Sequence, residues 1–202
     1  MGKHLLVING HPDPRPERYC SALSQAFGDG ARDGGWSVHT LDAATLHFNS
    51  GKTGADISLD MAARLIHATD RLAIVFPLWF DDPPQAVGRL LAHAVQSQAN
   101  APDTAERPKR IAQLVVTMEM PAFIHRSMVR ADGKRGDGRK LESLPGFDAA
   151  HVTFIGSVGA ISLEQRQQWL REIRELGVQS ERVVKLPRKW LPDVRALTMR
   201  AA

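Results

Sequence analysis

Four short aliphatic runs, each closed by a turn-forming or polar residue, constrain the fold of this chain more than any other feature of its sequence. Polar and apolar residues do not alternate within them, which is typical of strands buried on both faces of a parallel sheet. The four predicted strands are His4–Asn9, Arg71–Phe76, Ile111–Thr117 and His151–Ile155. A fifth run, Ser37–Leu41, does alternate and predicts an outer strand of the same sheet.

Amphipathic segments lie between these strands and predict helices. Apolar residues recur at helical spacing over 19–31, and Leu59–Ala68 and Ala86–Val95 show the same pattern. After the last strand, Ser162 and Gln165 have the spacing of a capping box. Gly177 then predicts the end of that last helix.

Strand and helix patterns alternate along the chain, which favours a parallel sheet with helices on both faces. Five strands with right-handed crossovers fit the doubly wound order 2-1-3-4-5 in a single α/β domain, residues 1–178, followed by a tail, residues 179–202. Ligands of such sheets bind outside the carboxyl ends of the strands, where the strand order reverses. We therefore expect the functional residues directly after the strands that end at Asn9, Phe76 and Thr117.

Composition narrows the class of protein further. Length and hydrophobic content, 202 residues and 43%, fit one folded domain and exclude disordered, collagen-like and coiled-coil classes. The single cysteine excludes a disulfide framework or a multi-cysteine metal site and fits a reducing cytosol. The histidines lack metal-ligand spacing, which argues against a metal site. No apolar run reaches the ~18 residues that a membrane helix needs. The net charge of +4 is spread along the chain, which does not favour nucleic-acid binding. We expect a soluble cytoplasmic protein without metal, nucleic acid or membrane partners.

The loop after the first strand leads directly into a helix, and a helix start offers free backbone N–H groups to an anion. His11 and Arg18 would add donors, and Ser21 a hydroxyl, so phosphate is the expected ligand. The loop matches neither the dinucleotide fingerprint nor the P-loop. The alternative is that its prolines only stiffen a connection.

Two aromatic residues, Trp79 and Phe80, follow the strand that ends at Phe76, where they would form a wall for a flat ring. The segment Thr117–Phe123 follows the next strand and would reach the same ring with backbone groups. The alternative is that both aromatics belong to the core. Together the three loops predict one crevice at the carboxyl edge of the sheet.

Cys20 allows two interpretations. A thiol in the first helical turn near His11 would have its pKa lowered by the helix dipole and could act as a nucleophile. A lone small cysteine that faces a helix–sheet core is the more common situation. If Cys20 is the nucleophile, the protein would be a hydrolase that depends on this residue, which is one alternative function.

Three segments, 6–12, 76–80 and 116–123, together with the final helix, resemble the flavodoxin-like NAD(P)H dehydrogenase (quinone) family over residues 3–177. The resemblance implies a flavodoxin-like fold and a homodimer that binds FMN or FAD, with FMN preferred. It also implies hydride transfer from NAD(P)H through the flavin to a quinone or a similar flat electrophile.

The resemblance also assigns site residues. Those implied at the flavin phosphate are His11, Arg18, Tyr19 and Cys20. Those implied along the flavin ring are Pro77, Leu78, Trp79 and Phe80. Those implied at the polar edge of the ring are Thr117, Met118, Glu119 and Met120.

Several positions depart from the family pattern. Glu119 stands where the family often has glycine, and a carboxylate there would disfavour negative charge on the ring. His125 and Asp132 occupy the places of a tyrosine and a histidine that manage charge on the flavin, and they are the expected catalytic residues. These departures favour, as the alternative function, a flavodoxin-like ancillary subunit with little or no turnover. The basic stretch 126–140 is expected to favour NADPH or to be a solvated connection.

Overall fold

Five parallel strands form one sheet in the order β2-β1-β3-β4-β5 in the computed structural model, which describes residues 3–46, 58–79, 83–99, 110–122, 147 and 149–179. The strands are β1 (His4–Asn9), β2 (Ser37–Asp42), β3 (Arg71–Pro77), β4 (Ile111–Thr117) and β5 (Ala149–Ile155). The predicted order and all five predicted strands are confirmed. Each strand keeps its predicted start or lies within two residues of it.

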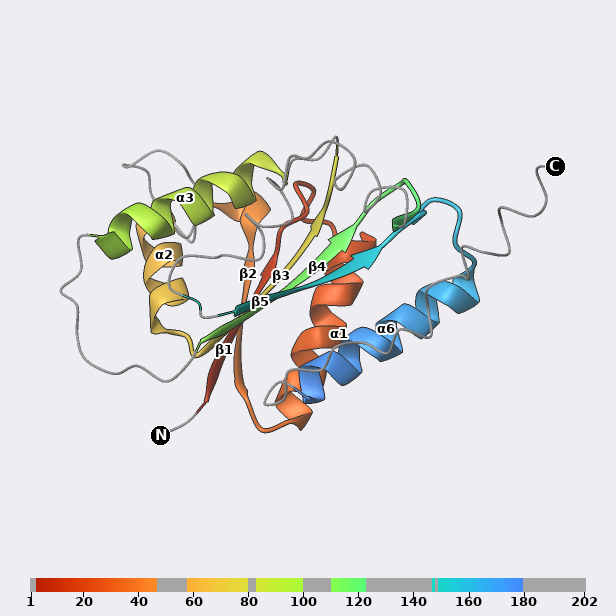
Figure 1. Cartoon of the computed structure of the whole chain (residues 1–202), viewed down its shortest axis with the longest axis horizontal. Helices are drawn as coiled ribbons and strands as arrows, with labels where there is room; N and C mark the ends of the chain where they lie inside the picture. The colour runs from red at the N-terminus through yellow and green to blue at the C-terminus, as the bar shows by residue number, and fades with distance from the viewer. Residues whose placement is uncertain are drawn as a thin grey trace.

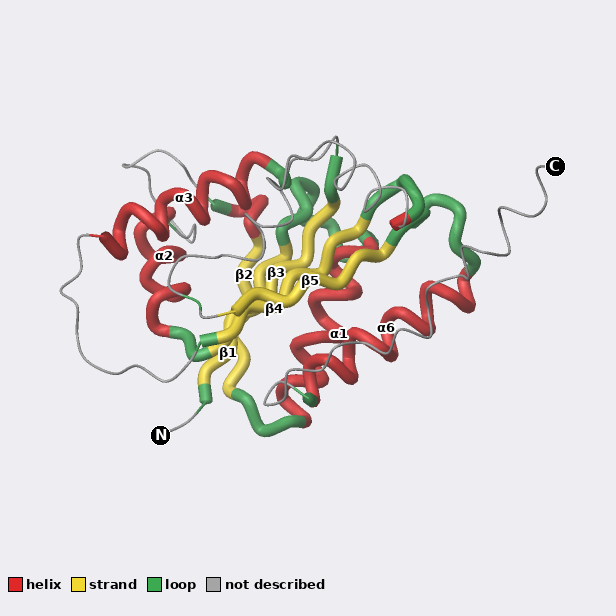
Figure 2. The backbone as a smooth tube through the Cα atoms, in the orientation of Figure 1, coloured by secondary structure: helices red, strands yellow, loops and turns green. Residues whose placement is uncertain are grey.

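Helices cover both faces of this sheet, as Figure 1 and Figure 2 show. The helices α1 and α6 lie on one face, and α2 and α3 lie on the other. The described helices are α1 (Tyr19–Asp33), the short 3-10 helix η1 (Ala43–Thr45), α2 (Leu59–Ala68), α3 (Gln85–Ala99) and α6 (Leu163–Val178). The arrangement is the predicted doubly wound α/β fold of a single domain.

Burial explains why the strand sequences lack alternation. Every residue of β3 is buried, because β1 and β4 flank it and helices cover both its faces. Leu6 and Ile8 of β1 pack toward α2 and α3, whereas Leu5 and Val7 pack toward α1 and α6. Both kinds of position in a central strand are therefore apolar. β2 pairs only with β1, and its alternating sequence reflects this edge position.

The capping box of α6 is confirmed, but the prediction that Gly177 ends this helix is wrong. Ser162 accepts the backbone N–H of Gln165, whose side chain accepts the Ser162 N–H. The helix continues to Val178, and Gly177 lies buried against α1. A Cβ at Gly177 would lie 2.2 Å from the carbonyl oxygen of Phe27. Gly177 therefore permits close helix packing.

Gly30 of α1 has the same role from the other side, and its replacement by alanine is expected to destabilise the protein. An added Cβ would lie 1.9 Å from the carbonyl oxygen of Arg174 in α6. Such overpacking costs about 1–3 kcal/mol, and the better helix propensity of alanine offsets about 1 kcal/mol of it. A net loss on the order of 1 kcal/mol in the free energy of unfolding is expected in urea titrations.

Gly88→Ala on α3 is the matched control, because a Cβ at Gly88 meets no atom within 4 Å. This variant is expected to be as stable as the natural protein or more stable, by up to about 1 kcal/mol. Equal stability of the two variants would show that α1 and α6 do not depend on a glycine contact.

Several predictions fall on parts of the chain that lie outside the described residues. These are the residues Phe80, His125 and Asp132, the basic stretch 126–140, and the tail after residue 179. Among the residues that are described, no helix is long and apolar enough to cross a bilayer. Within the same ranges, no three His, Cys, Asp or Glu side chains gather where they could hold a metal ion.

Candidate functional site

The sheet order reverses between β1 and β3, and two rings meet there at the carboxyl edge. His11 follows β1 and Trp79 follows β3. The centroids of their rings lie 6.2 Å apart, with an interplanar angle of 76°. The Trp79 side chain is 47% exposed, whereas Leu78 and Pro77 before it are buried. The exposed indole therefore stands at the position where such a sheet binds its ligand.

Local hydrogen bonds fix the orientation of His11. Its backbone N–H donates to Oδ1 of Asn9 at 3.2 Å, and its Nδ1 lies 3.0 Å from the backbone N of Asp13. Among the described residues, Nε2 of His11 has no hydrogen-bond partner. The free nitrogen is available to a ligand beside Trp79.

The start of α1 lacks the side-chain cap that α2 and α6 have. Its N-cap residue, Arg18, accepts no backbone N–H with its side chain. By contrast, Ser58 caps α2 and Ser162 caps α6. The first N–H groups of any helix lack partners within the helix and carry the positive end of its dipole. The place where the sequence predicts an anion is therefore an open helix start with a cation, Arg18, at its N-cap.

Two arginines converge on one carboxylate in the loop before α1. Asp13 accepts from Nη2 of Arg15 at 2.6 Å and from Nε of Arg18 at 2.7 Å. Hydrogen bonds from Arg15 and Arg18 hold the pKa of the Asp13 carboxyl well below its usual range. The cluster carries one net positive charge beside the open helix start. Asp13 thus keeps both guanidinium groups near the place where an anion would bind.

The side chains of Tyr19 and Cys20 point away from this loop. The Tyr19 hydroxyl donates to the carbonyl oxygen of Arg166 in α6 at 3.1 Å, and burial raises the Tyr19 pKa to about 12. Cys20 is 2% exposed, and its Sγ lies 3.4 Å from Oγ1 of Thr117. What these two residues offer to an anion at the start of α1 is therefore their backbone N–H groups, and not their side chains.

Burial decides the chemistry of Cys20. The desolvation of the thiolate raises the pKa of the Cys20 thiol to about 11. The prediction that the helix dipole would lower this pKa is therefore wrong. At neutral pH the thiol is protonated, and a protonated buried thiol is a poor nucleophile.

Cys20→Ala is expected to lower the free energy of unfolding by on the order of 1 kcal/mol, because it leaves a small cavity, and to leave the catalytic activity of the protein unchanged. Thermal unfolding and an activity assay measure the two effects. Loss of turnover in a folded Cys20→Ala protein would restore the nucleophile interpretation.

Backbone hydrogen bonds join the loops that follow β3, β4 and β5. Leu78 N–H donates to the Thr117 carbonyl at 2.7 Å, and Met118 N–H donates to the Ile155 carbonyl at 2.9 Å. Ser157, whose φ is 56°, donates its N–H to the Met120 carbonyl at 3.1 Å. These bonds leave the backbone N–H groups of residues 119 and 120 without an acceptor in the part of the chain that the structure describes. Two donors are thus available at this edge.

The carboxylate of Glu119 is turned toward the loop between β5 and α6. Its Oε2 accepts the backbone N–H of Gly159 at 3.2 Å. A Cβ at Gly159 would lie 2.6 Å from the same oxygen, so glycine leaves room for the carboxylate. Glu119 is therefore accommodated by a neighbouring loop, where the family often has glycine in its place.

Sequence reasoning missed two residues that organise the site. The Asn9 amide donates to Oγ of Ser21 at 3.0 Å and to Oδ1 of Asp42 at 2.5 Å, so it joins β1 to α1 and β2. The signal was a polar residue at the end of an otherwise apolar run. Asp13 was also missed, and its signal was a carboxylate two residues before Arg15 and five before Arg18 in a short loop.

An exposed ring and an open helix start therefore share the carboxyl edge of a doubly wound sheet, where α/β proteins of this class bind their ligands. The sequence matches the Flavodoxin_2 family, described as a flavodoxin-like fold, over residues 3–176. The chain belongs to this family. A comparison with curated protein sequences finds no match.

Solved structures with the same fold include three reductases. An NAD(P)H:quinone oxidoreductase from Methanothermobacter marburgensis has a TM-score of 0.70 and 15% identity, with 92% of this chain and 100% of that chain covered. An FMN-dependent NADH-azoreductase from Bacillus anthracis, in complex with FMN, has a TM-score of 0.65, 9% identity, and coverage of 89% and 100%. An azoreductase from Bacillus anthracis has a TM-score of 0.57, 13% identity, and coverage of 89% and 98%. At these identities the likeness concerns the fold.

Proposed function

We propose that this protein is a flavin-dependent oxidoreductase that takes hydride from NAD(P)H and passes it to quinones or similar flat electrophiles. One observation carries the proposal: the exposed Trp79 ring lies beside His11 and near the open, basic start of α1. A phosphorylated flat ring is the ligand that this combination fits. The names of the solved reductases with the same fold support it.

The residues of the site fit a flavin. Arg18 and the open N–H groups of α1 suit the flavin phosphate, and Trp79 offers a large apolar surface to the ring. The N–H groups of Glu119 and Met120 suit its polar edge. When bound, the flavin supplies the hydride chemistry, and the protein holds it and tunes its charge.

The direction of the Glu119 side chain matters for this chemistry. A carboxylate at the polar edge would oppose the negative charge that accompanies reduction of the ring. Its hydrogen bond to Gly159 directs that charge into the neighbouring loop. Glu119 therefore offers its backbone N–H, and not its carboxylate, to the polar edge of the ring.

The proposal extends to residues outside the described ranges. Phe80 is proposed to line the ring beside Trp79, and His125 and Asp132 are proposed to manage protons and charge on the flavin. The resident cofactor is proposed to be a flavin nucleotide, FMN or FAD. A homodimer in the cytoplasm is proposed as the working form, and size-exclusion chromatography tests the dimer.

The experiment is a spectrum of the purified protein, followed by reconstitution with FMN and FAD and an assay of NADH and NADPH oxidation against several quinones. Stoichiometric flavin and quinone-dependent oxidation are expected. A colourless protein that takes up neither flavin contradicts the proposal. Flavin bound without turnover would instead favour an ancillary subunit that keeps the fold and the nucleotide site.

A further inference from the structure

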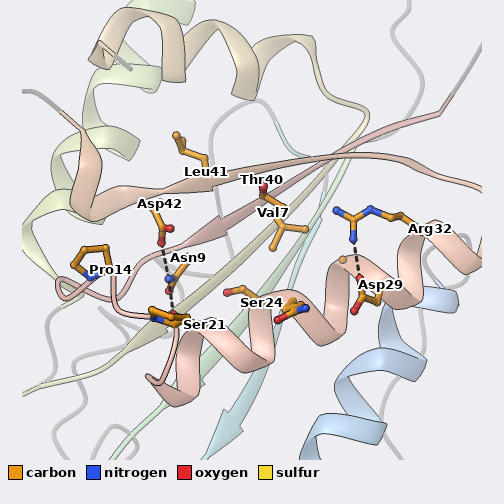
Figure 3. A pocket seen from close by; sticks show the side chains of 13 residues that line it. Val7, Asn9, Pro14, Ser21, Ser24, Asp29, Arg32, Thr40, Leu41 and Asp42 are labelled. Carbon is orange, nitrogen blue, oxygen red and sulfur yellow. Dashed lines mark hydrogen bonds and ion pairs between the residues drawn. The ribbon is translucent and has the colours of Figure 1, made fainter. Parts of the chain in front are cut away.

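A cavity opens between α1 and the edge strand β2 (Figure 3). Its volume is about 410 Å³, which lies in the range of small-molecule sites. We call it the α1–β2 groove. Its walls come from the side of α1 that faces β2, and its floor comes from the ends of β1 and β2.

The sequence of α1 explains why this groove is open. Leu23, Phe27 and Ala31 face the core between α1 and α6. The side of α1 that faces β2 instead carries small or polar residues at helical spacing, among them Ser24 and Gly28. No large apolar side chain of α1 fills the space above β2, so a groove remains. A helix face made of small and polar residues buries little apolar surface, so this face of α1 contributes little to core packing.

A hydrogen-bonded polar row lies at the end of the groove nearest the ring site. The strand register places Asn9 beside Asp42. Figure 3 shows the Asn9 amide between Asp42 and Ser21, with which it forms hydrogen bonds of 2.5 and 3.0 Å. Only Oδ1 of Asp42 takes part, and within the described residues its Oδ2 has no donor. An acceptor is therefore left at the carboxyl end of β2.

A buried hydroxyl in the wall of the groove lacks any partner. Ser24 is 7% exposed, and its Oγ has no hydrogen bond with any described residue. In Figure 3 the Ser24 side chain points from α1 toward the strands that form the floor. Burial of an unpaired hydroxyl opposes folding. A ligand that fills the groove would give this hydroxyl its missing partner.

We propose that the α1–β2 groove binds an adenosine 5′-phosphate group, with the phosphate toward the start of α1. A carboxylate at the carboxyl end of the strand beside β1 is suited to accept hydrogen bonds from a ribose diol, and Asp42 has this place. From Ser21 to Arg32 the groove follows α1 for roughly 16 Å, which leaves room for a nucleoside.

Three molecules could bring this group to the groove: FAD through its adenosine half, NAD(P)H through its own adenosine half, or a free adenine nucleotide. For FAD the inference rests on the proposed function, because the phosphates must then share the α1 start with the flavin. In that case the protein prefers FAD to FMN. ADP alone tests the groove without reference to flavin.

The experiment measures the Kd values of FMN, FAD and ADP by calorimetry for the natural protein, Gly28→Leu and Gly88→Leu. A side chain at Gly28 would start at ordinary contact distances, 3.6 Å from Val38 and 3.9 Å from Val7, and would extend into the groove. Gly88 on α3 has open space and is the matched control. We expect the natural protein to bind ADP, and to bind FAD at least tenfold more tightly than FMN. Gly28→Leu should lose both properties and keep the natural FMN Kd.

The outcomes separate the groove from the ring site. ADP binding with equal FMN and FAD affinity supports the groove and excludes FAD as its occupant, and a competition titration of ADP with NADH and NADPH then separates NAD(P)H from a free adenine nucleotide. FMN binding with no ADP binding and no preference for FAD overturns the groove and leaves the proposed function standing. ADP binding without binding of either flavin supports the groove and contradicts the proposed function.

Ser24→Ala provides a second variant in case Gly28→Leu does not fold. Because the Ser24 hydroxyl has no partner within the described chain, its removal is expected to leave Tm unchanged or higher. The affinity for ADP should fall several-fold. A lower Tm with unchanged ADP affinity would show that the hydroxyl serves the fold, and would count against the proposal.

Discussion

Trp79→Ala is expected to weaken flavin binding by about 1–3 kcal/mol, a roughly 5- to 150-fold rise in Kd, because the ring loses its aromatic surface. The fold should be unaffected, since 47% of the Trp79 side chain is already exposed and its loss opens no core cavity. Fluorescence titration of the apoprotein with FMN gives the Kd, and thermal unfolding without flavin gives the stability.

Met61→Ala is the control for the loss of an exposed apolar side chain. Met61 has the same 47% exposure, but it lies on α2, away from the loops of the site. Its substitution should leave the flavin Kd unchanged. If Trp79→Ala also leaves the Kd unchanged, the ring does not bind at the edge between β1 and β3.

The fold could be predicted from the sequence because buried strand positions carry apolar residues and exposed positions carry polar ones. In β3 and β4 nearly every residue is buried, and apart from Arg71, Gln113 and Thr117 both strands consist of apolar residues. β2 is an edge strand, and of its residues only Leu41 is buried. Gly177 was misread because a glycine that ends a helix and a glycine that lets two helices touch are identical in sequence. Only the position of α1 distinguishes them.

The site could be predicted only in part, because its chemistry depends on where side chains point. The three converging loops follow from the strand order, and the approach of His11 to Trp79 agrees with that expectation. The directions of Cys20 and Glu119 do not follow from it. One side chain turns into the core and the other toward Gly159, and both directions depend on contacts between distant segments. The pairing of Asn9 with Asp42 is likewise set by strand register.

Arg18→Ala is expected to weaken the binding of FMN, which has a phosphate, and not the binding of riboflavin, which has only the ring and its side chain. Hydrogen bonds to a charged group contribute about 1.5–3 kcal/mol, so the Kd of FMN should rise roughly 10- to 150-fold. Riboflavin has the same ring without a phosphate, and its Kd should not change. Parallel fluorescence titrations with the two ligands measure the difference. The Arg18 side chain is 41% exposed, so its removal should affect stability little.

Arg64→Ala on α2 removes one positive charge from the opposite face of the sheet and controls for net charge. If Arg18 contacts the phosphate, Arg64→Ala keeps the natural FMN Kd. The difference in FMN Kd between Arg18→Ala and the natural protein should then decrease only gradually as salt is added. Equal losses of FMN and riboflavin affinity in Arg18→Ala would mean that the residue shapes the loop. The anion at the start of α1 would then have to be held by the backbone N–H groups and Arg15.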